Sequence, residues 1–401
     1  MGSLALALGC SSDAASPSLS AKPLAETALT VGSAFSCAVT TDATPYCWGR
    51  NLSGELGDST IASRLVPGVV GGGHSFVAIS ASLATACALE RSGTVWCWGD
   101  DPTQPGVALS FRSKPVAIPA GRPLVSISVG RKSACGLDTD GAAYCWGENG
   151  RGQLGAGDTI PHPQPVRVVG NLHFSAISAG FWTTCGLSTG GTIYCWGDNT
   201  YGELGTGDTL SSSIAKKVAT TTTFKSVMTG SIHSCGLTAT GSAMCWGANF
   251  SGQLGDGTAL RRLTPVAAAP GLTFTMLRAG RANSIFTHTC GVTPSADVYC
   301  WGWDSKGQLG SAVAQDPCTP STPPGVTPGT GISPAVCSYA AVKVAGVSNV
   351  VTLDTGQEHT CALTSAALLL CWGDNAYGQL GDGTGIASAT PVQVKGGLSF
   401  P

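Results

Sequence analysis

The stretch Cys145–Gly155, which reads Cys-Trp-Gly-Glu-Asn-Gly-Arg-Gly-Gln-Leu-Gly, decides the fold of this 401-residue chain, because its first triplet recurs. Cys-Trp-Gly occurs seven times, with its cysteine at positions 47, 97, 145, 195, 245, 300 and 371. By subtraction, successive copies lie 50, 48, 50, 50, 55 and 71 residues apart. A period near 50 residues is typical of propellers and solenoids, whose units bury their apolar faces against one another. The repeat therefore predicts one body, although length alone suggests two or three domains.

Each unit has the pattern of four short strands. Examples are an opening apolar strand (Phe174–Gly180), a strand with a first cysteine (His233–Thr238) and a strand that runs into Trp-Gly (Ile193–Gly197). A loop of the form Asn-x-x-Gly-x-Leu-Gly follows, and then a Pro-Val strand such as Pro165–Val168. Four strands of about five residues, with their turns, account for about 50 residues. The prediction is an all-β fold, a seven-bladed β-propeller of four-stranded antiparallel blades.

The chain ends predict how the ring closes. The segment Leu24–Val31 looks like a strand without a preceding fourth strand, and the chain stops where another opening strand would begin. We therefore expect the N-terminal and C-terminal strands to pair, with Leu24–Val31 in the same blade as Pro391–Val394. The predicted domains are a signal and tether over residues 1–23 and a propeller over residues 24–401, with an insertion at about 311–340.

Cysteine spacing gives the second strong signal. Fourteen of the 17 cysteines form seven pairs ten residues apart: Cys37 with Cys47, Cys87 with Cys97, Cys135 with Cys145, Cys185 with Cys195, Cys235 with Cys245, Cys290 with Cys300, and Cys361 with Cys371. In a hairpin with a central turn, such residues face each other within disulfide reach. The spacing does not match the short Cys-x2–4-Cys steps of zinc sites, so we predict disulfides and an oxidising compartment. The tryptophan after each second cysteine then faces the opposite side of the blade, toward its neighbour.

Three cysteines lie outside this pattern. Cys318 and Cys337 lie in the insertion, which is rich in Pro, Thr and Gly, and we expect them to form a disulfide that closes this loop. Cys10 ends the short apolar run Leu4–Cys10, which is similar to a bacterial lipoprotein signal, and a polar tether follows. This predicts lipidation of Cys10 and location in the cell envelope or outside the cell. No Lys or Arg precedes the run, so two alternatives stay open: a start upstream of Met1, and a free thiol in a disordered tail.

Composition excludes several classes of function. A net charge of −2, with no basic run, gives no electrostatic case for binding nucleic acid or an anionic membrane. No stretch approaches 18 uninterrupted apolar residues. We find no nucleophile elbow, phosphate-binding loop or calcium loop, and we predict neither an enzyme nor a cofactor. Asp residues follow the Leu-Gly of five loops (Asp58, Asp158, Asp208, Asp256 and Asp382), and this repetition favours turn residues over catalytic carboxylates.

The unit resembles the regulator of chromosome condensation repeat. The copies Trp146–Gly155, Trp246–Gly257 and Trp372–Gly383 carry the likeness, which extends over about residues 24–400. The resemblance implies a seven-bladed propeller. Members include a nuclear guanine nucleotide exchange factor for a small GTPase, a secreted bacterial inhibitor of β-lactamases, and many scaffolds. This chain departs from the nuclear members in its Cys pairs, its export-like N-terminus and its late insertion, so exchange activity is not transferred to it.

Three histidines occupy one repeat position. His233, His288 and His359 each lie two residues before the first cysteine of their units. A metal site is one interpretation, and the family resemblance favours another, in which these histidines form hydrogen bonds between blades.

Four aromatic residues are the candidate binding rim: Tyr201, Phe250, Trp303 and Tyr377. They replace polar residues in the loops of adjacent units, so they would lie along one face, as interface residues do. The alternative is that they pack under neighbouring loops. Phe181, Trp182 and Phe286 precede second strands and would line the opposite end of the propeller.

The functional prediction is an exported, lipid-anchored, monomeric scaffold that binds a protein or glycan partner through its loop faces. The membrane would be reached only through the N-terminal lipid. One alternative is a secreted inhibitor of an enzyme of the β-lactamase type. A second alternative is an exchange-factor-like regulator of a small GTPase.

Overall fold

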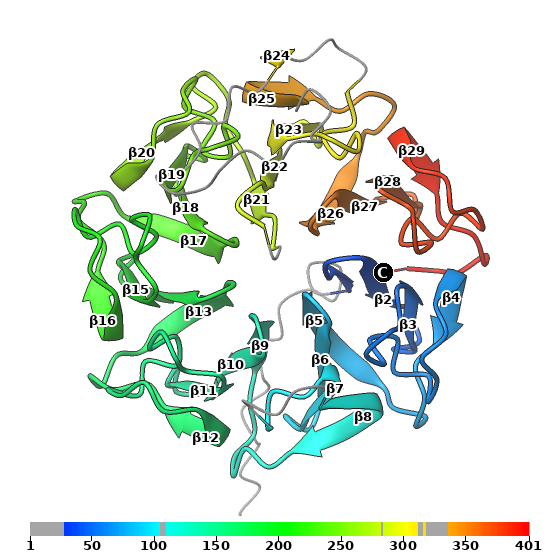
Figure 1. The fold of residues 1–401 in the computed structure, drawn as a ribbon, viewed down its shortest axis with the longest axis horizontal. Coiled ribbons are helices and arrows are strands. Elements are labelled where there is room, and N and C mark those ends of the chain that lie inside the picture. The colour runs from blue at the N-terminus through cyan, green and yellow to red at the C-terminus, as the bar shows by residue number, and fades with distance from the viewer. Residues whose placement is uncertain (1–27, 105–109, 282–283, 312–315, 318–335, 401) are drawn as a thin grey trace, which may run out of the picture.

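The computed structural model describes residues 28–104, 110–281, 284–311, 316–317 and 336–400, and these form a closed ring of seven blades (Figure 1). The described residues contain strands and turns but no helix, and hence no helix long and apolar enough to cross a membrane. Every strand pairing is antiparallel, and the four main strands of each blade follow chain order from the axis outward, while blade 6 adds a short fifth strand at its outer edge, out of chain order. The predicted fold class is confirmed.

The strand bounds repeat from blade to blade. Blade 1 comprises β1 (Leu29–Val31), β2 (Phe35–Val39), β3 (Pro45–Gly49) and β4 (Arg64–Val69); blade 2 comprises β5 (Phe76–Ser82), β6 (Thr85–Glu90), β7 (Val95–Asp100) and β8 (Phe111–Ile118). Blade 3 comprises β9 (Ser126–Val129), β10 (Ser133–Leu137), β11 (Ala143–Gly147) and β12 (His162–Arg167); blade 4 comprises β13 (Phe174–Ala179), β14 (Thr183–Ser188), β15 (Ile193–Gly197) and β16 (Ser212–Lys217). Blade 5 comprises β17 (Phe224–Thr229), β18 (His233–Thr238), β19 (Ala243–Gly247) and β20 (Arg262–Ala268). Blade 6 comprises β21 (Met276–Ala279), β22 (His288–Val292), β23 (Val298–Trp303), β25 (Val336–Lys343) and the added short β24 (Asp316–Pro317); blade 7 comprises β26 (Val350–Thr355), β27 (His359–Thr364), β28 (Leu369–Gly373) and β29 (Ser388–Gln393).

The second and third strands of every blade are joined by a disulfide. Cysteines ten residues apart lie directly opposite each other in the register, with Cα–Cα distances of 4.0–4.1 Å in all seven pairs. In chain order, the pairs are Cys37 with Cys47, Cys87 with Cys97, Cys135 with Cys145, Cys185 with Cys195, Cys235 with Cys245, Cys290 with Cys300, and Cys361 with Cys371. The hairpin geometry inferred from the spacing is the geometry observed.

Backbone geometry explains why the third residue of Cys-Trp-Gly is glycine. Gly147 has φ +107°, and a Cβ there would lie 2.3 Å from the backbone oxygen of Lys132 in the preceding turn. A shift in register between Cys145 and Gly147 marks a bulge in the pairing of β11 with β12. Only glycine tolerates both the positive φ and the close backbone approach.

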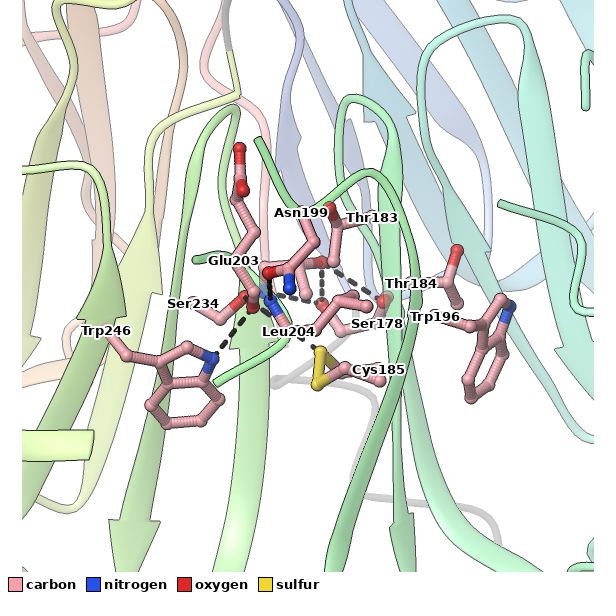
Figure 2. Close-up of a disulfide and its surroundings, with 12 residues drawn as sticks. Ser178, Thr183, Thr184, Cys185, Trp196, Asn199, Glu203, Leu204, Ser234 and Trp246 are labelled. Atoms are coloured by element: carbon pink, nitrogen blue, oxygen red, sulfur yellow. Dashed lines mark hydrogen bonds between the residues drawn. A yellow bond between two sulfur atoms is a disulfide. The ribbon is translucent and has the colours of Figure 1, made fainter. Parts of the chain in front are cut away.

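Seven of the hydrophobic clusters in the described core lie at the boundaries between blades, one at each boundary. In each cluster the disulfide of one blade packs with the Cys-Trp-Gly tryptophan of the next blade, as the Cys185 disulfide does with Trp246. All seven of these tryptophans are at most 1% exposed. Figure 2 shows the Cys185 disulfide between Trp246 on one side and Trp196 on the other. The tryptophans are therefore core residues, as the alternation of side chains along a strand predicts.

The predicted pairing of N- and C-terminal strands is wrong. β1 pairs with β2 inside blade 1, and β29 pairs with β28 inside blade 7, because seven complete four-stranded units leave no strand to share. The ring closes instead through cross-blade bonds, such as Val31 N to Asp354 Oδ2 at 2.9 Å. Beyond β29 the tail reaches blade 1, where Thr41 N donates to Ser399 O and Phe400 is buried in the cluster that contains Trp48.

Several predictions fall wholly or partly outside the described residues. These include lipidation of Cys10, the signal and tether over residues 1–23, and the insertion between β24 and β25. Cys337 is disulfide-bonded, and Cys318, its predicted partner, lies outside the described residues.

Candidate functional site

One face of the ring carries the long loops that follow the third strands. These loops lie beside the turns between first and second strands, since Lys132 O accepts Glu148 N and Trp182 O accepts Asp198 N. We call this side the loop face. It contains the pocket and the aromatic residues considered next as candidates for binding.

Each standard loop is held by its asparagine. In blade 4, the Oδ1 of fully buried Asn199 accepts Leu204 N at 2.8 Å, and its Nδ2 donates to Asp208 O, Asp208 Oδ1 and Leu210 O. The asparagines of blades 1, 3, 5 and 7 make the same bond to the loop leucine. The repeated aspartates bond within their own loops and to the start of the strand that follows, as Asp58 does to Thr60 and Arg64, which supports their interpretation as turn residues.

The loop also joins its blade to the next one. The carbonyl of Glu203, just before Leu204, accepts Trp246 Nε1 at 2.8 Å and Ser234 Oγ at 3.0 Å from blade 5 (Figure 2). The same carbonyl position accepts a tryptophan Nε1 at six blade boundaries, those of Trp48, Trp98, Trp196, Trp246, Trp301 and Trp372. The standard loop is thus a clamp between blades as well as a surface feature.

No described residue of blade 2 forms this clamp. Its loop has no Gly-x-Leu-Gly, and Trp146 of blade 3 has a buried Nε1 without a hydrogen-bond partner among the described residues. At five other boundaries a Ser or Thr hydroxyl donates to the same loop carbonyl as the tryptophan. Blade 3 has Ala134 at this position, so this second donor is missing. Asp101 organises the blade 2 loop instead, accepting Arg112 Nε at 2.7 Å and Thr103 N at 2.9 Å.

A pocket of about 340 Å³ opens on the loop face where blade 2 meets its neighbours. Its lining includes Arg50, Asp100, Arg131, Lys132 and Gln357. Arg50 bonds to Glu55 within its own loop at 2.9 Å, and Arg131 bonds to Glu148 at 3.1 Å. Lys132 forms no ion pair with another described residue. The pocket therefore presents cationic side chains on a chain that is slightly acidic overall.

An aromatic residue flanked by arginines lies next to this pocket. The guanidinium carbons of Arg131 and Arg151 lie 5.3 and 5.5 Å from the Trp182 ring centre, within the range of cation–π interactions. Phe181 packs edge-on against Trp182 at 4.5 Å. We define the Arg–Trp patch as Arg50, Arg131, Lys132, Arg151 and Trp182. The prediction that Phe181 and Trp182 line the opposite end is wrong, because they follow Gly180 in a turn on the loop face.

The predicted aromatic rim does not form one exposed row. Phe250 and Trp303 are only 8% and 7% exposed, and Tyr201 is half-buried against Phe250 at 5.3 Å. Trp303 stacks on Phe286 at 4.4 Å, and its Nε1 donates to Ser305 Oγ. Only Tyr377, at 40% exposed, projects well into solvent. Neighbouring side chains cover the other three, so the alternative of packing under loops is the correct one for them.

The three histidines form hydrogen bonds between blades. The Nε2 of His233, His288 and His359 lies 2.9–3.0 Å from a hydroxyl of the next blade, on Thr289, Thr360 and Ser36 respectively. Each hydroxyl donates its own proton to a loop carbonyl, so the histidine Nε2 must donate and its Nδ1 must be unprotonated. Burial lowers the pKa of His233 to about 4 and those of His288 and His359 to about 3, so all three are neutral at pH 7. Within the described ranges, no group of three or more His, Cys, Asp or Glu residues could hold a metal ion.

Two loops carry glutamate where four others carry glutamine. Glu55 has Arg50 as its partner, whereas the equivalent Glu203 lies near Asp198. Burial, followed by the repulsion from Asp198, raises the pKa of Glu203 to about 8, against the effect of backbone hydrogen bonds. In blade 7, Gln379 Nε2 donates to Asp374, which occupies the position of Asp198. Glu203 is therefore a protonated carboxyl at neutral pH in a place where glutamine fits.

Sequence reasoning missed the Arg–Trp patch. Arg131 and Lys132 follow the glycine of one opening strand, and Arg50 follows the Trp-Gly of another unit. These positions lie far apart in the chain and meet only because blades 1 and 3 both border blade 2. Aligning the seven units position by position would have shown four cations, Arg50, Arg131, Lys132 and Arg151, at the turn and loop positions of units 1 and 3.

Comparisons with known proteins agree with this geometry. The RCC1-like domain model matches residues 1–330, and models of the regulator of chromosome condensation (RCC1) repeat match residues 350–379 and 368–400. The ultraviolet-B receptor UVR8 of Arabidopsis thaliana is 29% identical over 164 residues, covering 32% of this chain and 36% of the receptor. The match thus spans about a third of that relative.

Solved structures show the same fold. Human WBSCR16 superposes with a TM-score of 0.72 at 19% identity, covering 88% of this chain and 94% of its own. Prp20p of Saccharomyces cerevisiae, described with its binding properties to Gsp1p and histones, gives 0.72 at 18% identity, covering 92% and 88%. The ectodomain of the Arabidopsis thaliana receptor kinase ACR4 gives 0.52 at 16% identity, covering 92% and 98%. With seven Trp-Gly blades and a family model that matches most of its length, the chain belongs to the regulator of chromosome condensation repeat family.

Proposed function

We propose that this protein is an exported scaffold that binds a protein partner through the Arg–Trp patch on its loop face. The observation that carries the proposal is a half-buried Trp182 between two arginines, beside a pocket with Arg50, Arg131 and Lys132. Trp and Arg are the residues most enriched at the energetic centres of protein interfaces. The relatives are regulators and receptors, which agrees with a binding role.

Export is supported by the disulfides. Seven blades each bury one, and reducing compartments keep such thiols reduced. Attachment through a lipid on Cys10 is part of the same proposal, and it rests on the sequence pattern at the N-terminus. The intact mass of the mature protein, isolated from the envelope of a bacterial host, would reveal the lipid.

The partner can be sought by affinity capture with matched variants. The test variant is the double change Arg131→Ala and Trp182→Ala, and the control is Lys306→Ala with Tyr377→Ala, on the same face over blades 6 and 7. Envelope and secreted proteins would be captured on wild type and both variants and quantified by mass spectrometry. We expect at least one protein to be lost tenfold or more with the test variant and retained with the control.

Salt adds a second criterion. Because the patch is cationic, capture should weaken as NaCl rises from 50 to 500 mM. An unchanged set of captured proteins with the test variant would refute binding through the Arg–Trp patch, whether or not the protein is exported.

A further inference from the structure

A second cavity lies on the axis of the ring, apart from the Arg–Trp patch. It has a volume of about 350 Å³, and the inner strands of all seven blades contribute to its lining. Its charged side chains are Lys225, Arg278, Arg281 and Asp354. The volume is at the lower end of the range of small-molecule sites.

One level of this cavity is a ring of equivalent residues, one from the inner strand of each blade. Each lies two positions before the glycine that follows its strand or, in blade 2, two positions before Ser82 at the strand end. The seven members are Thr30, Ser80, Ser128, Ser178, Met228, Arg278 and Asp354. Five carry an oxygen that accepts a backbone N–H from the next blade, at 2.8–3.1 Å. Met228 and Arg278 cannot accept such a bond. Blade 6 thus places a cation where four blades place a structural hydroxyl.

The carboxylate in the cavity is already engaged. Asp354 Oδ2 accepts Val31 N at 2.9 Å and Thr30 Oγ1 at 3.2 Å, and Oδ1 lies 3.7 Å from Arg278 Nε. Asp354 therefore balances the charge of Arg278 and anchors the boundary between blades 7 and 1.

Arg281 has no such partner. Its Nη1 donates to Ala81 O of blade 2 at 3.3 Å, so the side chain extends from blade 6 toward a distant blade. Its Nε is buried without a hydrogen-bond partner in the described part of the chain, and Asp354, the carboxylate that attracts it, makes its ion pair with Arg278 instead. A guanidinium keeps its charge at any physiological pH, and a buried charge is unfavourable unless an opposite charge compensates it. Lys225 adds a second cation to the lining.

We propose that the axial cavity binds a small oxyanion, a phosphate or carboxylate group, with Arg281 as the principal ligand. The planar guanidinium offers paired N–H donors that match two oxygens of such a group. Lys225 contributes long-range attraction from the exposed part of the lining, and Arg278 remains the partner of Asp354. The volume limits the ligand to a free anion or a small metabolite.

The test is calorimetric titration of the full chain with sodium phosphate and, separately, sodium citrate, at constant ionic strength in chloride. We expect one site per chain for at least one anion, and at least tenfold weaker binding by Arg281→Gln. Lys306→Gln, which changes an exposed cation on the loop face outside the Arg–Trp patch, should bind like wild type. Binding of phosphate alone, of citrate alone or of both would show which oxyanion the cavity prefers.

Lys225→Gln keeps the test decisive if Arg281→Gln does not fold. Because Lys225 is exposed, its replacement should leave the fold intact and weaken binding two- to fivefold. Absence of binding of both anions to wild type would overturn the proposal. Equal anion affinity of wild type and Arg281→Gln would also overturn it. If Arg281→Gln does not fold, equal anion affinity of wild type and Lys225→Gln would do the same.

Discussion

Blades 4 and 2 have the same disulfide hairpin and the same core tryptophan, yet only blade 4 keeps the standard loop. In blade 4 the loop carbonyl of Glu203 holds Trp246 of the next blade. At the corresponding boundary after blade 2, Trp146 Nε1 has no partner among the described residues, and a pocket lies on the face above. The disulfide hairpin and the loop are thus separable parts. The hairpin forms the blade, and the loop can be altered to provide a binding surface.

The largest expected effect comes from removing the residue that organises a standard loop. Asn199→Ala leaves Leu204 N and three oxygen acceptors without their buried partner, and it should lower the free energy of unfolding by about 3 kcal/mol. Asp101→Ala, the counterpart in blade 2, loses an ion pair to the partly exposed Arg112 and should cost about 1 kcal/mol. Urea unfolding of the oxidised proteins measures both. Equal losses would show that the standard loop is no more important to stability than the altered one.

The next effect is a gain in stability. Glu203→Gln should stabilise the protein by about 2 kcal/mol at pH 7. In the unfolded chain Glu203 ionises above its ordinary pKa, whereas the folded chain keeps it protonated up to about pH 8, so between these pH values the wild type must take up a proton in order to fold. The wild type therefore loses stability as pH rises from about 4.5 to 8, and the variant does not. The advantage of the variant should be near zero at pH 4.5 and reach its maximum above pH 8.

Glu55→Gln is the matched control for this prediction. It removes the ion pair with Arg50 and should destabilise the protein by up to about 1 kcal/mol. If Glu203→Gln also destabilises the protein at pH 7, a raised carboxyl pKa in blade 4 is ruled out.

The smallest effect is a difference between two tryptophans. Trp246→Phe loses both ring volume and the hydrogen bond to Glu203 O, whereas Trp146→Phe loses ring volume but no hydrogen bond to any described residue. The losses in unfolding free energy should differ by about 1 kcal/mol, with Trp246→Phe the more damaging. Identical losses would mean that the hydrogen bond between blades contributes nothing measurable.

The structure of a blade could be predicted from the sequence, but the way in which the ring closes could not. The ten-residue cysteine spacing determines the hairpin register, and the adjacent tryptophan must then face the other side, so both are local consequences of strand geometry. Closure depends on how complete units meet. The tail residues Ser399 and Phe400 reach blade 1 at the turn between β2 and β3, which contains Thr41, without adding a strand. Counting strands from the sequence could not distinguish these two arrangements.

The binding surface was less predictable than the fold. Phe250 and Trp303 occupy loop positions that are polar in other units, but whether a loop side chain projects or packs depends on its neighbours, here Tyr201 and Phe286. The Arg–Trp patch joins residues from three blades, and its pocket lies where a loop departs from the standard pattern. Neither property follows from one unit considered alone.

Peptide mapping of the non-reduced protein by mass spectrometry, after expression with export to a bacterial periplasm, tests the central claim most directly. Seven disulfides are expected in the blade hairpins, in addition to the one that holds Cys337, and each joins cysteines ten residues apart within one blade, from Cys37 with Cys47 to Cys361 with Cys371. Free thiols at these positions, or bridges that join different blades, would contradict both the stapled propeller and its export.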